Sequence, residues 1–323
     1  DTSAAVRARA FQSTSGPGSP ELLAKATSLL EDPEPAVRQS AASALGKKPD
    51  DRALEPLIRA ASDPIPDVRR AVVEALCLYD DERAVAVLLK AMDDPSVAVR
   101  MAVFEGYRHR RPEAIPAALI TIALNDRSPD IRRMATEMIS VGDLTAGKGD
   151  LLFIALKSPD PAVRARAVRG LRSVKGPRAF DAAAARIGDD SADVRLAAIE
   201  TLLELRAKGA NDVIARALQD ADSTVRVRAA GALIRLNDPR GIEAMRPLLR
   251  DPSLGTRGQA LFALQTSGAP EAVSLASTLL EDPDRGIRIG AATLLMTRKD
   301  PHGIEALLRL AGETQTVEAS IIQ

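Results

Sequence analysis

The 323-residue sequence has very few aromatic side chains, no tryptophan and a single cysteine, Cys77. Aromatic residues make up 2% of the chain, which disfavours a nucleic-acid surface that stacks bases on rings. One cysteine excludes an intrachain disulfide and is typical of a reducing compartment. No histidine lies near Cys77 in the sequence to activate a thiolate, so we interpret it as a packing residue.

The sequence also lacks an excess of either charge, and it lacks the common metal-binding and nucleotide-binding motifs. Lys plus Arg and Asp plus Glu number 44 each, which provides no general attraction to nucleic acid or to anionic membranes. Apolar runs do not reach the roughly 18 to 20 residues that span a bilayer. The two histidines, His109 and His302, belong to no zinc motif, and neither Gly-Lys pair has a P-loop frame. We therefore expect no catalytic residues, no cofactor, no metal, no nucleic-acid partner and no membrane insertion.

What the sequence does contain is one phrase repeated along its length: Asp, often Pro, three variable residues, Val or Ile, then Arg. Seven of the nine intervals between successive arginines are 31 residues and two are 32. The arginines of this register are Arg7, Arg38, Arg69, Arg100, Arg132, Arg164, Arg195, Arg226, Arg257 and Arg288. Asp stands six residues before each of them, except that Ser158 precedes Arg164. Such regularity indicates a repeat protein.

Each phrase predicts a turn that leads into a helix. Ser or Asp stands four residues before most of the arginines, where its side chain can cap the first turn. Proline follows at the first helical position in four repeats; these prolines are Pro35, Pro66, Pro129 and Pro161. Three residues after the arginine comes Ala or Val, and seven residues after it usually a large apolar side chain, on the same helix face. A second helical stretch precedes each turn, so each repeat is predicted to be helix A, turn, helix B.

This phrase within a helix–turn–helix unit resembles HEAT repeats, and the 31-residue period is similar to the short HEAT-like repeats of bilin lyases and bacterial scaffold proteins. The resemblance implies an all-α, right-handed α-solenoid of about nine full repeats plus partial terminal repeats over residues 1–323. It also implies that the Asp and Arg ladder is structural. Because a solenoid needs polar capping repeats and neither end carries one, we expect a segment of a longer protein, whose last residues stop inside a final helix B. The compartment stays open: the cytoplasm fits the lone cysteine, and a leader before Asp1 would allow export.

The candidate binding residues lie on helix B, which lines the concave face of such solenoids. The helical phase predicts that positions two and five after each ladder arginine point away from the core. These positions form an acidic stripe, then a mixed, Arg-rich stretch, and last an exposed phenylalanine. In that order the residues are Glu74, Glu105 and Glu137; Arg166, Arg169, Glu200 and Arg228; and Phe262. The alternative is a neutral, solvated face. The basic run from Arg108 to Arg111 is interpreted as a solvated loop.

These observations favour a non-catalytic protein–protein interaction scaffold that binds an extended or helical segment of a partner on its concave helix-B surface. The resemblance leaves a bilin-lyase-like enzyme or chaperone as the alternative. Nucleic-acid binding is the third hypothesis, which the neutral charge disfavours.

Overall fold

The structure is a computed structural model, and it describes residues 19–108, 115–141, 148–174 and 176–321. The described residues form helices and contain no strand, which confirms the all-α class. The chain divides into two compact units, residues 1–167 and 168–323. The ladder position Arg7 and most of the basic run that begins at Arg108 lie outside the described residues.

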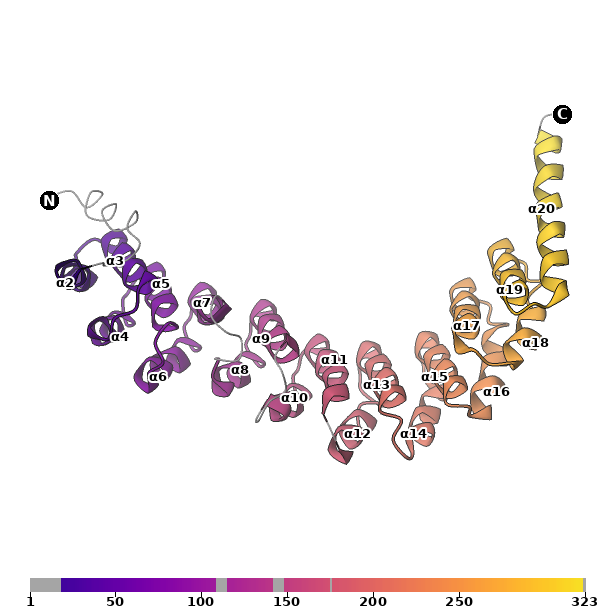
Figure 1. The fold of residues 1–323 in the computed structure, drawn as a ribbon, viewed down its shortest axis with the longest axis horizontal. Helices are drawn as coiled ribbons and strands as arrows, with labels where there is room; N and C mark the ends of the chain where they lie inside the picture. The colour runs from indigo at the N-terminus through magenta and orange to yellow at the C-terminus, as the bar shows by residue number, and fades with distance from the viewer. Residues whose placement is uncertain (1–18, 109–114, 142–147, 175, 322–323) are drawn as a thin grey trace. The chain divides into compact units, whose positions relative to one another are not determined.

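Unit 1 consists of helix pairs in which each A helix is followed by a B helix (Figure 1). Its A helices are α2 (Pro20–Ser28), α4 (Leu54–Ala60), α6 (Glu82–Ala91), α8 (Ala117–Ala123) and α10 (Lys148–Ala155). Its B helices are α3 (Pro35–Lys47), α5 (Pro66–Leu76), α7 (Val97–Arg108), α9 (Pro129–Val141) and α11 (Pro161–Gly170), the last of which crosses the unit boundary.

Unit 2 repeats the same arrangement. Its A helices are α12 (Pro177–Ala184), α14 (Ala210–Arg216), α16 (Pro239–Leu248) and α18 (Glu271–Ser277). Its B helices are α13 (Ala192–Leu205), α15 (Ser223–Arg235), α17 (Leu254–Ser267) and α19 (Arg285–Thr297). Within each unit the B helices form one row and the A helices a second (Figure 1). The nine A–B pairs in the described residues confirm the predicted number of full repeats, whereas a single solenoid over the whole chain stays a prediction.

Local sequence determines where the B helices begin. The four prolines predicted at the first helical position are the first residues of α3, α5, α9 and α11. In unit 2 aspartate side chains cap α15 and α19: Asp222 accepts hydrogen bonds from the N–H groups of Thr224 and Val225, and Asp284 accepts one from Ile287. These bonds satisfy backbone donors that have no partner inside the helix. Ser191, predicted as a cap of α13, makes no such bond.

The core of each unit lies between the two rows and is lined by small and aliphatic side chains. The alanines or valines three residues after the ladder arginines are at most 1% exposed, from Ala41 in α3 to Ala291 in α19. A small side chain there lets neighbouring helices approach closely, and stacking repeats this contact along each unit. The offsets expected to face the core are therefore confirmed.

The arginines and aspartates form an inter-repeat ladder at the A–B turns. Arg100 donates from Nε and Nη2 to the two carboxylate oxygens of Asp126 in the next repeat, at 2.8 and 3.0 Å. Its Nη1 donates to the carbonyl oxygen of Asp94 in its own turn, at 2.9 Å. Asp126 also accepts a bond from the N–H of Ser128. The same bidentate pairs join Arg38 to Asp63, Arg69 to Asp94, Arg195 to Asp220 and Arg257 to Asp282. Because these charges satisfy each other and the turns, the ladder is structural.

Two positions of the ladder differ from these bidentate pairs. Where Ser158 replaces the expected aspartate, Asp160 pairs with Arg132 at 2.8 Å, while the Ser158 hydroxyl donates to the carbonyl of Leu124. The other difference lies between α15 and α17. Arg226 there donates to the carbonyls of its own turn, and no ion pair within the described residues joins it to an aspartate of the next repeat.

The C-terminal helix corrects one expectation. The sequence predicted a turn and a separate final helix B, but α20 continues without interruption from Pro301 to Ile321. The segment after Gly312 contains neither the Asp-Pro phrase nor any proline. Without a residue that breaks the hydrogen-bond pattern, the helix continues.

Candidate interaction surface on the B helices

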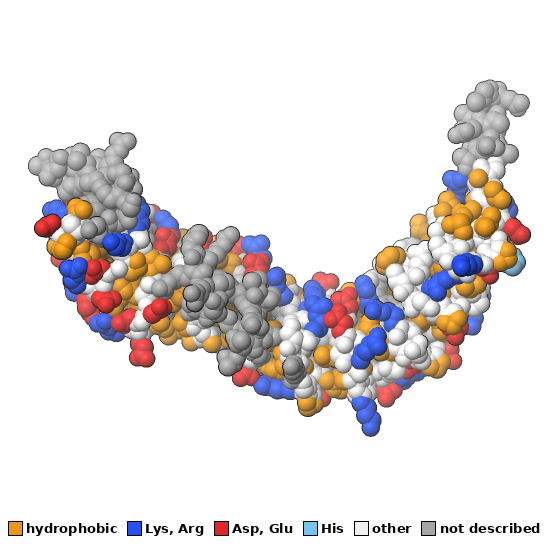
Figure 2. Space-filling model, viewed as in Figure 1, with side chains coloured by type: hydrophobic (Ala, Val, Ile, Leu, Met, Phe, Trp, Pro, Cys, Tyr) orange, Lys and Arg blue, Asp and Glu red, His pale blue; other side chains and the backbone are white. Residues whose placement is uncertain are grey.

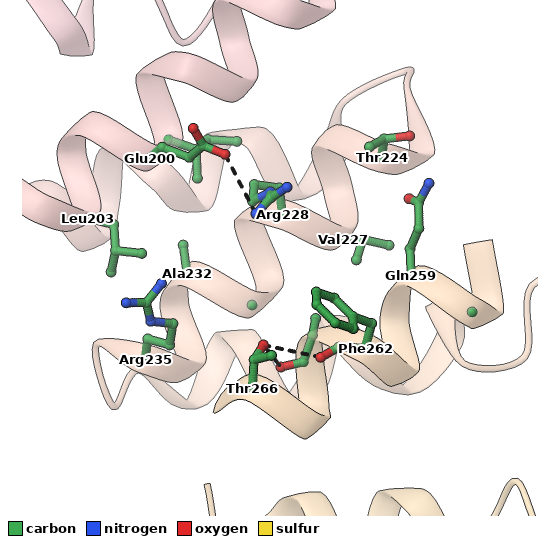
Figure 3. A pocket seen from close by; sticks show the side chains of 14 residues that line it. Glu200, Leu203, Thr224, Val227, Arg228, Ala232, Arg235, Gln259, Phe262 and Thr266 are labelled. Carbon is green, nitrogen blue, oxygen red and sulfur yellow. Dashed lines mark hydrogen bonds and ion pairs between the residues drawn. The ribbon is translucent and has the colours of Figure 1, made fainter. Parts of the chain in front are cut away.

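Three successive B helices of unit 2 line a cavity of about 400 Å³ that is open to solvent. α13, α15 and α17 all contribute side chains to it (Figure 3). Its lining residues are Ile199, Glu200, Leu203, Thr224, Val227, Arg228, Gly231, Ala232, Arg235, Gly258, Gln259, Phe262, Ala263 and Thr266. The volume is within the range of cavities that hold small ligands or the anchoring side chain of a partner.

Small residues explain why this cavity exists between helices that otherwise pack closely. A Cβ at Gly231 of α15 would lie 3.3 Å from the Cβ of Ala263 in α17. The two backbones therefore approach closely, and neither residue carries a side chain long enough to fill the space above the contact. Gly258 of α17 also lines the cavity and has no side chain to fill it.

Phe262 is the most prominent side chain of this surface. It is 65% exposed and rises from α17 toward α15, between Val227 and Thr266 (Figure 3). By contrast, Phe104 of unit 1 is fully buried. Exposing a large ring to water is unfavourable, by roughly 1.5–3 kcal/mol relative to burial, and an exposed apolar side chain at the edge of a cavity is typical of a binding site.

Charged groups surround the apolar part of the cavity. Nη1 of Arg228 on α15 lies 3.6 Å from Oε1 of Glu200 on α13, too far for a strong hydrogen bond (Figure 3). Arg235, at the end of α15, is exposed and has no hydrogen bond or ion pair within the described residues. The Thr266 hydroxyl is already satisfied by the carbonyls of Phe262 and Ala263. In Figure 2 basic side chains gather over the α13–α15 part of unit 2, with acidic ones between them.

Three of the predicted binding residues, Glu200, Arg228 and Phe262, thus line one cavity. The others lie elsewhere on the B helices. Of the acidic stripe, Glu105 of α7 and Glu137 of α9 are exposed, whereas Glu74 of α5 is half-buried and pairs with Arg70 at 2.6 Å. Arg169 of α11 is exposed and Arg166 is half-buried.

The phase assigned to position two was wrong in four repeats. Ser40, Ala71, Ala102 and Ala197 occupy it and are buried. The preceding B helix covers this side: a Cβ at Gly290, also at position two, would come within 2.8 Å of Leu261. Position five was described correctly as facing away from the core.

Several lining residues, Arg235 and Thr266 among them, were not predicted from the sequence. Both lie nine residues after their ladder arginine, which is one helical turn beyond position five on the same face. Extending the position-five stripe by one turn would have found them.

Within the described residues, no group of three or more His, Cys, Asp or Glu side chains could hold a metal ion. The helices of the same residues include none that is long and apolar enough to cross a membrane.

Comparison with known proteins places these repeats in a family. A family profile for HEAT repeats matches residues 1–77, 54–140, 115–202, 182–265 and 242–323, whereas no curated protein sequence matches the chain. Among solved structures, Kap121p bound to Ste12p is 16% identical with a TM-score of 0.59, and the match covers 94% of this chain and 44% of that one. Importin beta is 15% identical with a TM-score of 0.54, over 85% of this chain and 46% of that one.

The chain therefore spans slightly less than half the length of these two structures, and the likeness concerns the fold alone. The CpcE and CpcF complex of phycocyanin lyase, from a Nostoc species, is 21% identical over 72% of this chain and 95% of that one. Its TM-score of 0.33 supports no conclusion. The family profile covers the whole chain, and the ladder and A–B pairs are the features expected of such repeats: the chain belongs to the HEAT repeat family.

Proposed function

We propose that this chain is a non-catalytic scaffold that binds a segment of another protein along its B helices, and that the cavity between α13, α15 and α17 is its anchoring point. The observation that carries the proposal is Phe262, a large apolar side chain left exposed beside an unfilled cavity. Aromatic and arginine side chains are the usual anchors of protein interfaces, and Arg228 and Arg235 line the same cavity.

The fold gives secondary support to this proposal. Kap121p, whose fold is similar, has been solved bound to the protein Ste12p. In unit 1 Glu105 and Glu137 expose their carboxylates on successive B helices, and Glu74, which is paired with Arg70, lies one repeat before them. We propose that this acidic stripe contacts a basic part of the partner, and that Arg166 and Arg169 contribute to binding on α11.

The test is affinity capture from the native cell with the wild-type chain and two matched variants. Phe262→Ser removes the anchor, and Leu308→Ser removes another exposed apolar side chain of unit 2, on α20, which is 69% exposed and outside the cavity. We expect a defined set of proteins that Leu308→Ser retains and Phe262→Ser loses.

A third variant reverses the charge of Glu74, Glu105 and Glu137 together, and we expect it to weaken capture of the same proteins. If every captured protein survives both Phe262→Ser and the triple reversal, the B helices are not the working surface.

A further inference from the structure

The two arginines of the cavity are spaced along a single face of α15. Arg228 and Arg235 are seven residues apart, which is two turns of helix and a rise of about 10 Å. Gly231 lies between them on the same face and belongs to the cavity lining. The surface of α15 therefore presents a cation, a gap and a second cation in a straight line.

The middle of this line is apolar. The gap at Gly231 is bordered by Val227 and Ala232 of α15 and by the ring of Phe262 from α17 (Figure 3). An apolar side chain that enters here would cover part of the exposed ring and displace water from the cavity.

Both cations can accept a new partner. Arg235 has no hydrogen bond or ion pair within the described residues. Arg228 makes no hydrogen bond from its guanidinium there either, and its one ion pair, to Glu200, is long at 3.6 Å. The lining thus carries two positive charges and one negative charge, and the negative charge lies at the Arg228 end.

We infer that the segment bound here is an acidic amphipathic helix, with two carboxylates seven residues apart on either side of one apolar side chain. This inference rests on the proposed function. On a helix, residues at i, i+3 or i+4, and i+7 share one face with the same rise of about 10 Å. The carboxylates pair with Arg228 and Arg235, and the apolar side chain enters the gap beside Phe262. Because Glu200 repels a carboxylate at one end, the contact with Arg235 is the stronger of the two.

The experiment is a selection from a displayed library of helical peptides, with the full chain as bait and the Phe262→Ala chain as counter-bait. We expect the enriched peptides to carry Asp or Glu at i and i+7 and an apolar residue at i+3 or i+4. Phe262-dependent peptides that are neutral or basic at those positions would overturn this inference and leave the proposed function standing. No Phe262-dependent enrichment would overturn it as well, while the native-cell capture decides the proposed function separately.

Fluorescence anisotropy of one enriched, labelled peptide then tests the charges. Arg235→Glu should weaken binding about tenfold or more, and Phe262→Ala about thirtyfold, as for an interface anchor. Arg216→Glu, which reverses an exposed arginine on helix α14 of the other row, is the matched control and should leave the affinity within about twofold. Glu200→Gln should strengthen binding, because it removes the repelling carboxylate. Equal losses for Arg235→Glu and Arg216→Glu would show that only the net charge matters, and the assignment of Arg235 would be wrong.

Discussion

Replacing Asp126 by alanine tests the structural role of the ladder most directly. In the rung that Asp126 forms with Arg100, the two side chains are 4% and 1% exposed. Asp126→Ala removes both carboxylate bonds to Arg100 and the bond from the N–H of Ser128. The buried guanidinium keeps only its bond to the carbonyl of Asp94. Leaving one member of a buried ion pair without its partner costs about 3–5 kcal/mol.

The matched control is Asp130→Ala, two residues into the next helix. Asp130 and Arg133 form an ion pair of 3.0 Å, but their side chains are 62% and 66% exposed. An exposed pair of this kind contributes about 0.2–1 kcal/mol. Each substitution removes one aspartate carboxylate from the same repeat. The two carboxylates differ chiefly in how deeply they are buried.

Native-state amide hydrogen exchange in α7 and α9 is the appropriate assay, because repeat arrays open locally. Asp126→Ala should raise the opening equilibrium there by about two to three and a half powers of ten, since 1.4 kcal/mol is a factor of ten. Arg100→Met in the Asp126→Ala background should recover part of the loss, because it removes the unpaired charge. Values for Asp126→Ala and Asp130→Ala within about 1 kcal/mol of each other would refute the buried-ladder reasoning.

Three further predictions concern glycine, phenylalanine and acid stability. Gly241→Ala should destabilise unit 2 by about 1–3 kcal/mol on urea unfolding, because a Cβ there would lie 2.7 Å from the backbone of α15; Gly188→Ala, with open space around it, should have little effect. Phe104→Ala should cost about 3–5 kcal/mol as a buried core substitution, whereas Phe262→Ala should stay within about 0.5–1 kcal/mol, and equal losses would contradict the exposure of Phe262. Asp238 accepts a side-chain hydrogen bond from the arginine two residues later, which lowers its pKa from 3.8 to about 2. Its stabilisation is therefore present above pH 4 and lost as the pH falls toward 2, so the deficit of Asp238→Asn in thermal unfolding should shrink over that window.

Three aspartates of the ladder, Asp63, Asp94 and Asp220, contribute to acid stability in the same direction as Asp238. Burial by itself raises the pKa of Asp63, but hydrogen bonds from Arg38 and from the N–H of Ile65 outweigh it and lower the pKa below its ordinary value. In Asp94 and Asp220, too, hydrogen bonds from an arginine and a backbone N–H outweigh the effect of burial and lower the pKa. These rungs stabilise the fold above the ordinary carboxylate range and weaken as acid protonates them.

Much of the fold was predictable because its signals are local. The caps, the prolines at the first helical positions and the small residue three positions after each arginine depend only on the helix that contains them. The site was less predictable. The exposure of Phe262 followed from helical phase, but the burial of Ala71 and Ala102 did not, because the neighbouring B helix covers them.

The sequence by itself determined the repeat, its period, its helix–turn–helix content and the structural nature of its Asp and Arg positions, since each is a periodic property of a single chain segment. Only the tertiary structure decided which aspartate each arginine binds. It showed, for example, that Asp160 pairs with Arg132 because the ladder position of that repeat holds Ser158. It alone also showed that Glu200, Arg228 and Phe262 surround one cavity. A cavity is the space that packed helices leave between them. The role of Gly231 in opening this one is therefore visible only once α13 and α17 are packed beside α15.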